Sequence, residues 1–192
     1  MSRRRDELTA RSLDYLLQHG VAGLSLRPLA AEIGTSARLL VYHFGSKEGL
    51  VTAAMDELQH RIQEFFGQMM ARPAKTRKKN VLRTFWDWII HPKNLAHMRL
   101  LFEVQALAVQ NPDKYAHYLE GTSSNWLDLI ESSLPPSKEK RYVATLCAAV
   151  IDGLLLEYLS TGDKVRTTKA LVVFDRIMDL KVPQRGRSGP TS

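Results

Sequence analysis

Three side chains near the N-terminus can donate hydrogen bonds to a nucleic acid. Arg38 carries a guanidinium group, which can form paired hydrogen bonds with a guanine base or a phosphate. Tyr42 and His43 can both donate to phosphate oxygens. The chemistry that binding in a DNA groove needs is therefore present.

Two short predicted helices position these donors. Ser25 is a suitable N-cap for the first helix, which ends at Gly34, and Thr35 or Ser36 can cap the second. Two short helices joined by a tight turn form a helix-turn-helix, in which the second helix enters the major groove of DNA. A first helix, from about Asp6 to His19, is expected to support the pair.

The apolar spacing of the second helix indicates which of its faces is buried. Leu40 and Phe44 lie four residues apart and are expected to point back toward Leu29 and Ile33. That packing leaves the donors exposed. Glycine between two short amphipathic helices also occurs in helical proteins that bind no nucleic acid, so this pattern alone leaves both interpretations open.

A longer motif favours DNA binding. Residues 8–50, and above all the string AAEIGTSARLLVYHFGSKEGL, resemble the DNA-binding domain of TetR-type transcriptional regulators. The positions that meet the usual pattern of that family are Leu29-Ala30, Gly34, Ser36, Leu40, His43-Phe44, Ser46-Lys47 and Leu50.

The resemblance implies a role for each matching position. Ala37, Arg38 and Leu39 match the variable reading positions of the recognition helix, and Arg27 matches a position that reaches a base or a phosphate. The full set of expected DNA-binding residues is Arg27, Ser36, Ala37, Arg38, Leu39, Tyr42, His43 and Lys47.

One position departs from the family pattern. Val41 stands where most members have a tyrosine, so the phosphate contact usually made from there is in doubt. The neighbouring Tyr42 is the candidate substitute.

Helical periodicity continues through the rest of the chain, and the fold class is expected to be all-α with about nine helices. The resemblance implies a three-helix helix-turn-helix domain followed by a helical ligand-binding and dimerisation domain. The expected domains are 1–50 for DNA binding, 51–180 for effector binding and dimerisation, and 181–192 as a disordered tail. Breaks at Gly and Pro place the later helices at about 47–70, 76–90, 94–110, 113–133, 137–160 and 166–180.

The last two predicted helices carry more apolar surface than one packing face can cover. The helix near 137–160 has apolar residues on two sides, and so does the helix near 166–180. A homodimer in which each copy contributes both helices to a four-helix bundle is the favoured explanation. The alternative is that both faces are covered within the monomer. The resemblance supports the dimer, because TetR-type regulators dimerise through their last two long helices.

The resemblance also implies a small-molecule effector held among the middle helices. The ligand candidates are the larger side chains expected to point inward, with an apolar or aromatic effector as the expected partner. They are Trp86, Met98, Phe102, Gln105 and Tyr158.

Positive charge is concentrated in short segments. The chain has 27 Lys and Arg against 20 Asp and Glu, a formal net charge of +7. Outside residues 3–5, 72–83 and 181–187, however, acidic residues outnumber basic ones. Arg3 to Arg5 are expected to form a basic arm that reaches along DNA, while the run at 72–83 is either solvated surface, which we favour, or a second DNA contact.

Other classes of function find little support. Cys147 is the single cysteine, which rules out an internal disulfide and fits a cytoplasmic protein. The six histidines show no metal-ligand spacing, and no catalytic motif or cofactor-binding loop is present, so no metal, cofactor or enzymatic activity is expected. No apolar run is expected to cross a membrane, because Asp152 and Glu157 interrupt the longest one.

The sequence therefore predicts a cytoplasmic regulator, most simply a repressor. It would bind a palindromic operator in double-stranded DNA as a homodimer and be released by a small-molecule effector. The alternative is a helical ligand-binding or scaffold protein with a vestigial helix-turn-helix.

Overall fold

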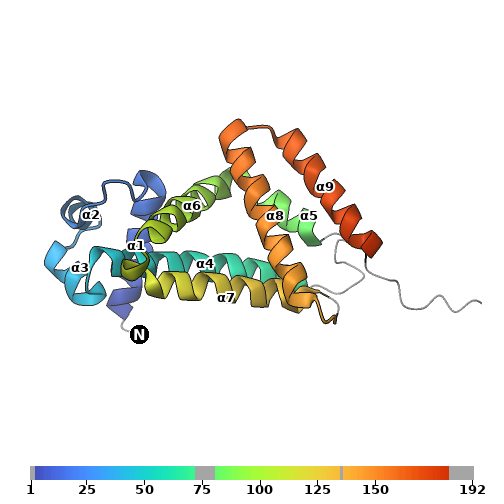
Figure 1. Cartoon of the computed structure of the whole chain (residues 1–192). Coiled ribbons are helices and arrows are strands. Elements are labelled where there is room, and N and C mark those ends of the chain that lie inside the picture. Colours follow the sequence, from blue (N-terminus) through green and yellow to red (C-terminus); the bar gives the residue numbers. More distant parts are fainter. Residues whose placement is uncertain (1–2, 72–80, 135, 182–192) are drawn as a thin grey trace, which may run out of the picture.

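The computed structural model describes residues 3–71, 81–134 and 136–181, and within these residues the fold is entirely helical. Nine α-helices are present in the described ranges, together with short 3₁₀ helices at Pro92–Asn94 and Pro112–Lys114 (Figure 1). The α-helices are α1 (Arg3–His19), α2 (Leu26–Glu32), α3 (Ala37–Phe44), α4 (Lys47–Ala71), α5 (Val81–Ile89), α6 (Leu95–Gln110), α7 (Ala116–Ser133), α8 (Lys140–Thr161) and α9 (Lys164–Lys181). The predicted fold class is confirmed.

Helices α1 to α3 and the first turns of α4 form a compact unit, called here the head, at one end of the molecule (Figure 1). Leu40 is fully buried and Phe44 is 9% exposed, and both join Leu29 and Ile33 in one apolar cluster. The expected packing of α3 against α2 is therefore confirmed. Arg11 of α1 adds a polar tie, because its Nη1 donates to the carbonyl oxygen of Ile33 at 3.0 Å.

Helix α4 connects the head to the rest of the chain. Leu50 and Ala53 pack into the core of the head, whereas Val51, Ala54 and Met55 face the larger core of the C-terminal helices. The predicted boundary at residue 50 therefore falls inside a continuous helix that belongs to both cores. A tilt of α4 relative to the body would therefore carry the head with it.

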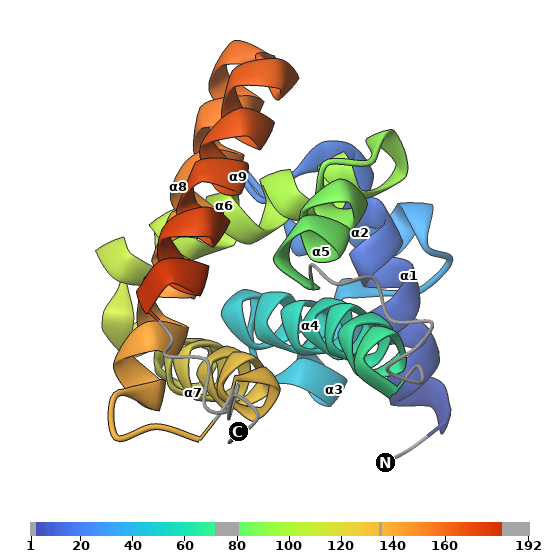
Figure 2. The same cartoon turned by 90° about the vertical axis from the view of Figure 1, so that its right-hand side faces the viewer.

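The C-terminal body contains helices α5 to α9. Helices α4 and α7 lie side by side, and α8 packs against both α7 and α9 (Figures 1 and 2). Trp86 of α5 is fully buried, and its Nε1 donates to Thr168 Oγ1 of α9 at 2.9 Å. This bond ties the last helix to the body.

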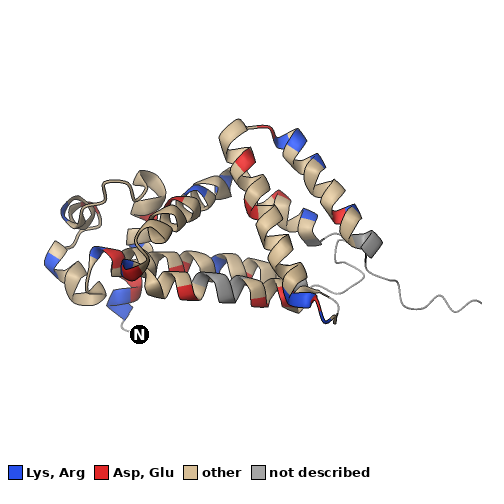
Figure 3. Ribbon diagram, viewed as in Figure 1, with Lys and Arg blue, Asp and Glu red and all other residues tan. Residues whose placement is uncertain are grey.

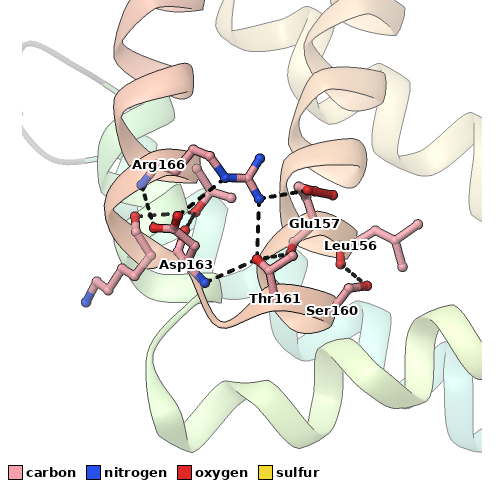
Figure 4. Close-up of polar contacts among 8 residues, drawn as sticks. Leu156, Glu157, Ser160, Thr161, Asp163 and Arg166 are labelled. Carbon is pink, nitrogen blue, oxygen red and sulfur yellow. Dashed lines mark hydrogen bonds and ion pairs between the residues drawn. The ribbon is translucent and has the colours of Figure 1, made fainter.

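Polar contacts fix the turn between α8 and α9. Arg166 Nη2 lies 2.7 Å from Glu157 Oε1, and the Arg166 backbone N–H donates to Asp163 Oδ1 at 2.9 Å (Figure 4). Thr161 Oγ1 accepts from the Asp163 backbone N–H at 3.2 Å. The acid at the start of α9 also suits the positive end of that helix. Together these contacts hold the two helices as one antiparallel pair.

The ends of some elements differ from the sequence prediction. Helix α1 begins at Arg3 instead of Asp6, so Arg3 to Arg5 belong to a helix and do not form an arm before it. Arg4 pairs with Glu7 at 2.7 Å, which offsets part of the unfavourable positive charge in the first turn. The start of the helix predicted at 76–90, most of the basic run at 72–83, and the tail beyond 181 lie outside the described residues.

Helix α8 corrects one expectation. By length and composition it could cross a bilayer, and it is the one helix in the described ranges that passes that test. The prediction treated Asp152 and Glu157 as sufficient interruptions, but the rest of the helix is apolar enough to outweigh them. Core helices of soluble proteins pass the same test, so this result shows only that α8 carries a large apolar surface that another element or molecule must bury.

Candidate nucleic-acid interface and effector cavity

The outward surface of the head carries the predicted DNA-binding residues. Ser36 caps α3, because its Oγ accepts a hydrogen bond from the Leu39 backbone N–H at 3.2 Å. Gly34 precedes the cap with φ +69°, a left-handed conformation that glycine adopts without strain. This turn sets the direction in which α3 leaves α2.

Exposure differs among the side chains of the recognition helix. Arg38 is exposed, and Tyr42 is 80% exposed, so both are free to reach a ligand surface. Ala37 and Leu39 are partly buried against the core of the head. Val41 is 45% exposed, and the adjacent Tyr42 side chain is also exposed, so no neighbouring side chain among the described residues prevents Tyr42 from making the phosphate contact expected at the position of Val41.

The remaining predicted residues flank this helix. Arg27 is exposed on α2, and Lys47 is exposed at the first residue of α4, with its Nζ 4.0 Å from Glu48 Oε1. His43 is partly buried, and its ring meets the Tyr42 ring edge-on at 5.1 Å between centroids. Figure 3 shows that Lys and Arg occur on each helix of this end of the molecule. The structure thus brings the predicted set onto one unit.

Arg5 was predicted to lie in a basic arm that reaches along DNA, but its side chain packs within the head. Its Nε donates to the carbonyl oxygen of His43 at 3.4 Å, and its guanidinium lies 5.4 Å from the centre of the Phe44 ring. These contacts brace the end of α3 against α1. Because the partners are 38 residues apart, no local pattern could have indicated them.

A cavity of about 530 Å³ lies in the C-terminal body among helices α4 to α8. Met98, Phe102 and Gln105 of α6 line it, as predicted for residues that point inward. Trp86 and Tyr158 do not line it: Trp86 is held by Thr168, and Tyr158 packs at the edge of the core. The wall is mostly apolar and its size suits a drug-sized molecule.

Two titratable side chains of α8 border the cavity. Burial raises the pKa of the Cys147 thiol, with the Asp175 carboxylate acting in the same direction, so the thiol stays protonated and unreactive. Burial also raises the pKa of the Asp152 carboxyl. Across the described ranges, no group of three or more His, Cys, Asp or Glu side chains could hold a metal ion.

Helix α6 joins the cavity to the head through Glu103. Its Oε1 accepts hydrogen bonds from the backbone N–H groups of Val21 at 2.9 Å and Ala22 at 2.7 Å, in the turn between α1 and α2. Gly20 precedes these amides, and a Cβ there would lie 2.8 Å from Glu103 Oε2. We call this contact the Glu103 clasp. Its neighbour Phe102 lines the cavity, so one helix contacts both sites.

Comparison with known proteins gives consistent matches. Residues 8–54 match the family model described as bacterial regulatory proteins, tetR family. The transcriptional regulator PksA of Bacillus subtilis (strain 168) is 25% identical over 173 residues, covering 87% of this chain and 83% of PksA.

Solved structures share the whole fold. A TetR transcription regulator from Haloarcula marismortui superposes with a TM-score of 0.72 at 17% identity, covering 94% of this chain and 98% of that one. The multidrug binding protein EbrR, solved in complex with ethidium, gives a TM-score of 0.61 at 23% identity, covering 88% of this chain and 97% of that one. EbrR has also been solved with proflavin.

Proposed function

The chain belongs to the TetR family of DNA-binding transcriptional regulators, and we propose that it is a homodimeric repressor that a small-molecule effector releases from a palindromic operator. The observation that carries this proposal is the division of α3 into two faces. Leu40 and Phe44 hold one face against the head, while Arg38 and Tyr42 stand exposed on the other. The family is one of regulators, and the proposed place of action is the cytoplasm.

Contacts to DNA divide into two kinds in this proposal. Arg38 near the start of α3 reads a base edge, with Ala37 and Leu39 beside it. Arg27, Tyr42, His43 and Lys47 bind phosphates and fix the register, and Ser36 holds the end of α3 in place.

Dimerisation through α8 and α9 would present two recognition helices to two half-sites. Support comes from large apolar side chains that are exposed on these helices in the single chain: Tyr142, Leu146, Leu156, Val165, Val172, Val173 and Ile177. A second copy suits this surface better than a bilayer does, because the ionised pair of Glu157 and Arg166 belongs to the same helices.

The cavity is the proposed effector site, and EbrR, which shares the fold, binds ethidium and proflavin. Release from DNA follows if the ligand prefers a state in which α6 has shifted. Such a shift would pull the Glu103 clasp and turn the head, so that the paired recognition helices no longer match the half-sites.

A salt-dependent titration of the full-length protein with duplex DNA tests the proposal. The logarithm of the affinity should fall linearly with the logarithm of salt concentration. Lys47→Ala should make that slope shallower by about 1 for each phosphate that the lysine neutralises. Arg38→Ala should mainly relax the preference for one base pair in each half-site, at a cost of about 1–3 kcal/mol for the preferred base.

Arg99→Ala is the matched control, because this exposed arginine lies on α6 in the C-terminal body. It should leave both the slope and the base preference unchanged. Equal effects of Arg99→Ala and Lys47→Ala would contradict the proposed interface.

A further inference from the structure

One acidic side chain stands in the wall of the cavity, and the other described residues that line it are uncharged. Asp152 is the single charged residue among the described residues that line it. The surrounding wall includes the aromatic rings of Phe66, Phe85, Phe102 and Tyr118. A ligand in this space would therefore meet aromatic side chains and one carboxylate.

The Asp152 carboxylate has no ionic partner among the described residues. Nearby acids differ in this respect: Glu157 pairs with Arg166 at 2.7 Å, and Glu131 pairs with Arg141 at 3.0 Å. Asp152 is exposed as a residue, yet partial burial of its carboxyl raises the pKa of that carboxyl. An uncompensated carboxylate in such a place lowers stability, and residues of this kind are typical of functional sites.

We propose that the cavity selects aromatic cations, with the positive charge of the ligand paired to Asp152 and its rings against the aromatic wall. This inference rests on the proposed role of the cavity as the effector site. A cation gains both the ion pair and attraction to the ring faces. A neutral molecule of the same shape gains only the burial of its apolar surface, and an anion is repelled.

Two dyes with the same three-ring body separate charge from shape. Proflavin is a cation at neutral pH, and its parent acridine is neutral. Binding of each to the full-length protein, without DNA, is measured by fluorescence titration. The wild type should bind proflavin at least about tenfold more tightly than acridine, the factor that corresponds to about 1.4 kcal/mol.

The decisive variant is Asp152→Asn, which keeps the size of the side chain and removes its charge. Proflavin affinity should fall by about tenfold, whereas acridine affinity should stay within about twofold. Asp152→Glu restores the charge and should restore the preference. Glu157→Gln is the matched control, because it neutralises an acid on the same helix that does not line the cavity, and it should change neither affinity.

The contrary results are equally specific. Equal losses for the two dyes in Asp152→Asn would assign the residue a structural role, and no loss for either, or no binding of proflavin to the wild type, would overturn the proposed selectivity. Failure of the regulatory proposal looks different. In that case proflavin binds in an Asp152-dependent manner, but adding it does not release the protein from its operator.

Discussion

The Glu103 clasp gives a quantitative prediction about the contact between the body and the head. Glu103→Ala removes the acceptor for the Val21 and Ala22 amides, which lie 2.9 and 2.7 Å from its Oε1. A hydrogen bond to a charged group contributes about 1.5–3 kcal/mol, and the lower end applies because the Ala22 amide is exposed. The variant should therefore lower the unfolding free energy by about 2–3 kcal/mol.

Gly20→Ala should disrupt the same contact from the other side. Its φ of +73° makes any other residue strained by about 1–2 kcal/mol. The added Cβ would also lie 2.8 and 3.1 Å from the two oxygens of Glu103, so the carboxylate must move away and leave the amides. The expected total cost is about 3–5 kcal/mol, the sum of the strain and the broken hydrogen bonds.

The double variant separates these causes. Once Gly20→Ala has displaced the carboxylate, adding Glu103→Ala should cost almost nothing further, so the two costs should fall short of additivity by about 2–3 kcal/mol. Urea unfolding of all four proteins at one protein concentration measures this difference.

Gly23→Ala provides the control for the backbone strain. Gly23 has a similar φ of +70°, but a Cβ there would meet no atom within 4 Å. Its cost should be about 1–2 kcal/mol and should add fully to that of Glu103→Ala. Full additivity of Gly20→Ala with Glu103→Ala would refute the clasp, and so would equal coupling by Gly23→Ala.

Three further predictions concern separate parts of the molecule. Ser36→Ala removes the cap of α3 and should lower the unfolding free energy by about 1 kcal/mol in a urea titration, and an unchanged midpoint would contradict the cap. Burial raises the pKa of the Asp152 carboxyl above its ordinary value of 3.8, so the folded state loses stability as pH rises from that value through the folded pKa. Asp152→Asn should therefore be more stable than the wild type in thermal melts at neutral pH, and the difference should disappear as pH falls toward 3.8. Leu156→Arg should convert the proposed dimer to a monomer in sedimentation, while Val109→Arg, at a side chain that is 65% exposed on α6, should not. Loss of the dimer in both variants, or in neither, would contradict the proposed interface.

Sequence reasoning predicted the head well because its signals are local. Gly34 and the cap at Ser36 mark the turn, and the four-residue spacing of Leu40 and Phe44 defines the buried face of α3. The helix-turn-helix therefore depends on contacts between residues that are near in sequence.

The cavity was only partly predictable, because its wall depends on contacts between distant helices. Periodicity indicated the inward face of α6, including Met98 and Phe102. It could not show that Trp86 is turned away by a hydrogen bond to Thr168, 82 residues later. Asp152 was interpreted, together with Glu157, as an interruption of an apolar run, and nothing in the sequence alone indicated that, of the two, only Asp152 lines the cavity.

Glu103 shows the same limit for the contact between head and body. Its partners Val21 and Ala22 lie more than 80 residues earlier and take part through backbone amides, which carry no sequence signature. Only the folded arrangement of α6 against the turn after α1 reveals the clasp.

Selection of bound sequences from a random pool of DNA duplexes tests the central claim most directly. The full-length protein, at moderate salt, should enrich a palindrome whose two half-sites are spaced to match a two-fold dimer. Arg38→Ala should relax the enriched sequence at one position in each half-site. Recovery of no palindromic sequence by the wild type would contradict the account of this protein as a dimeric, operator-specific regulator.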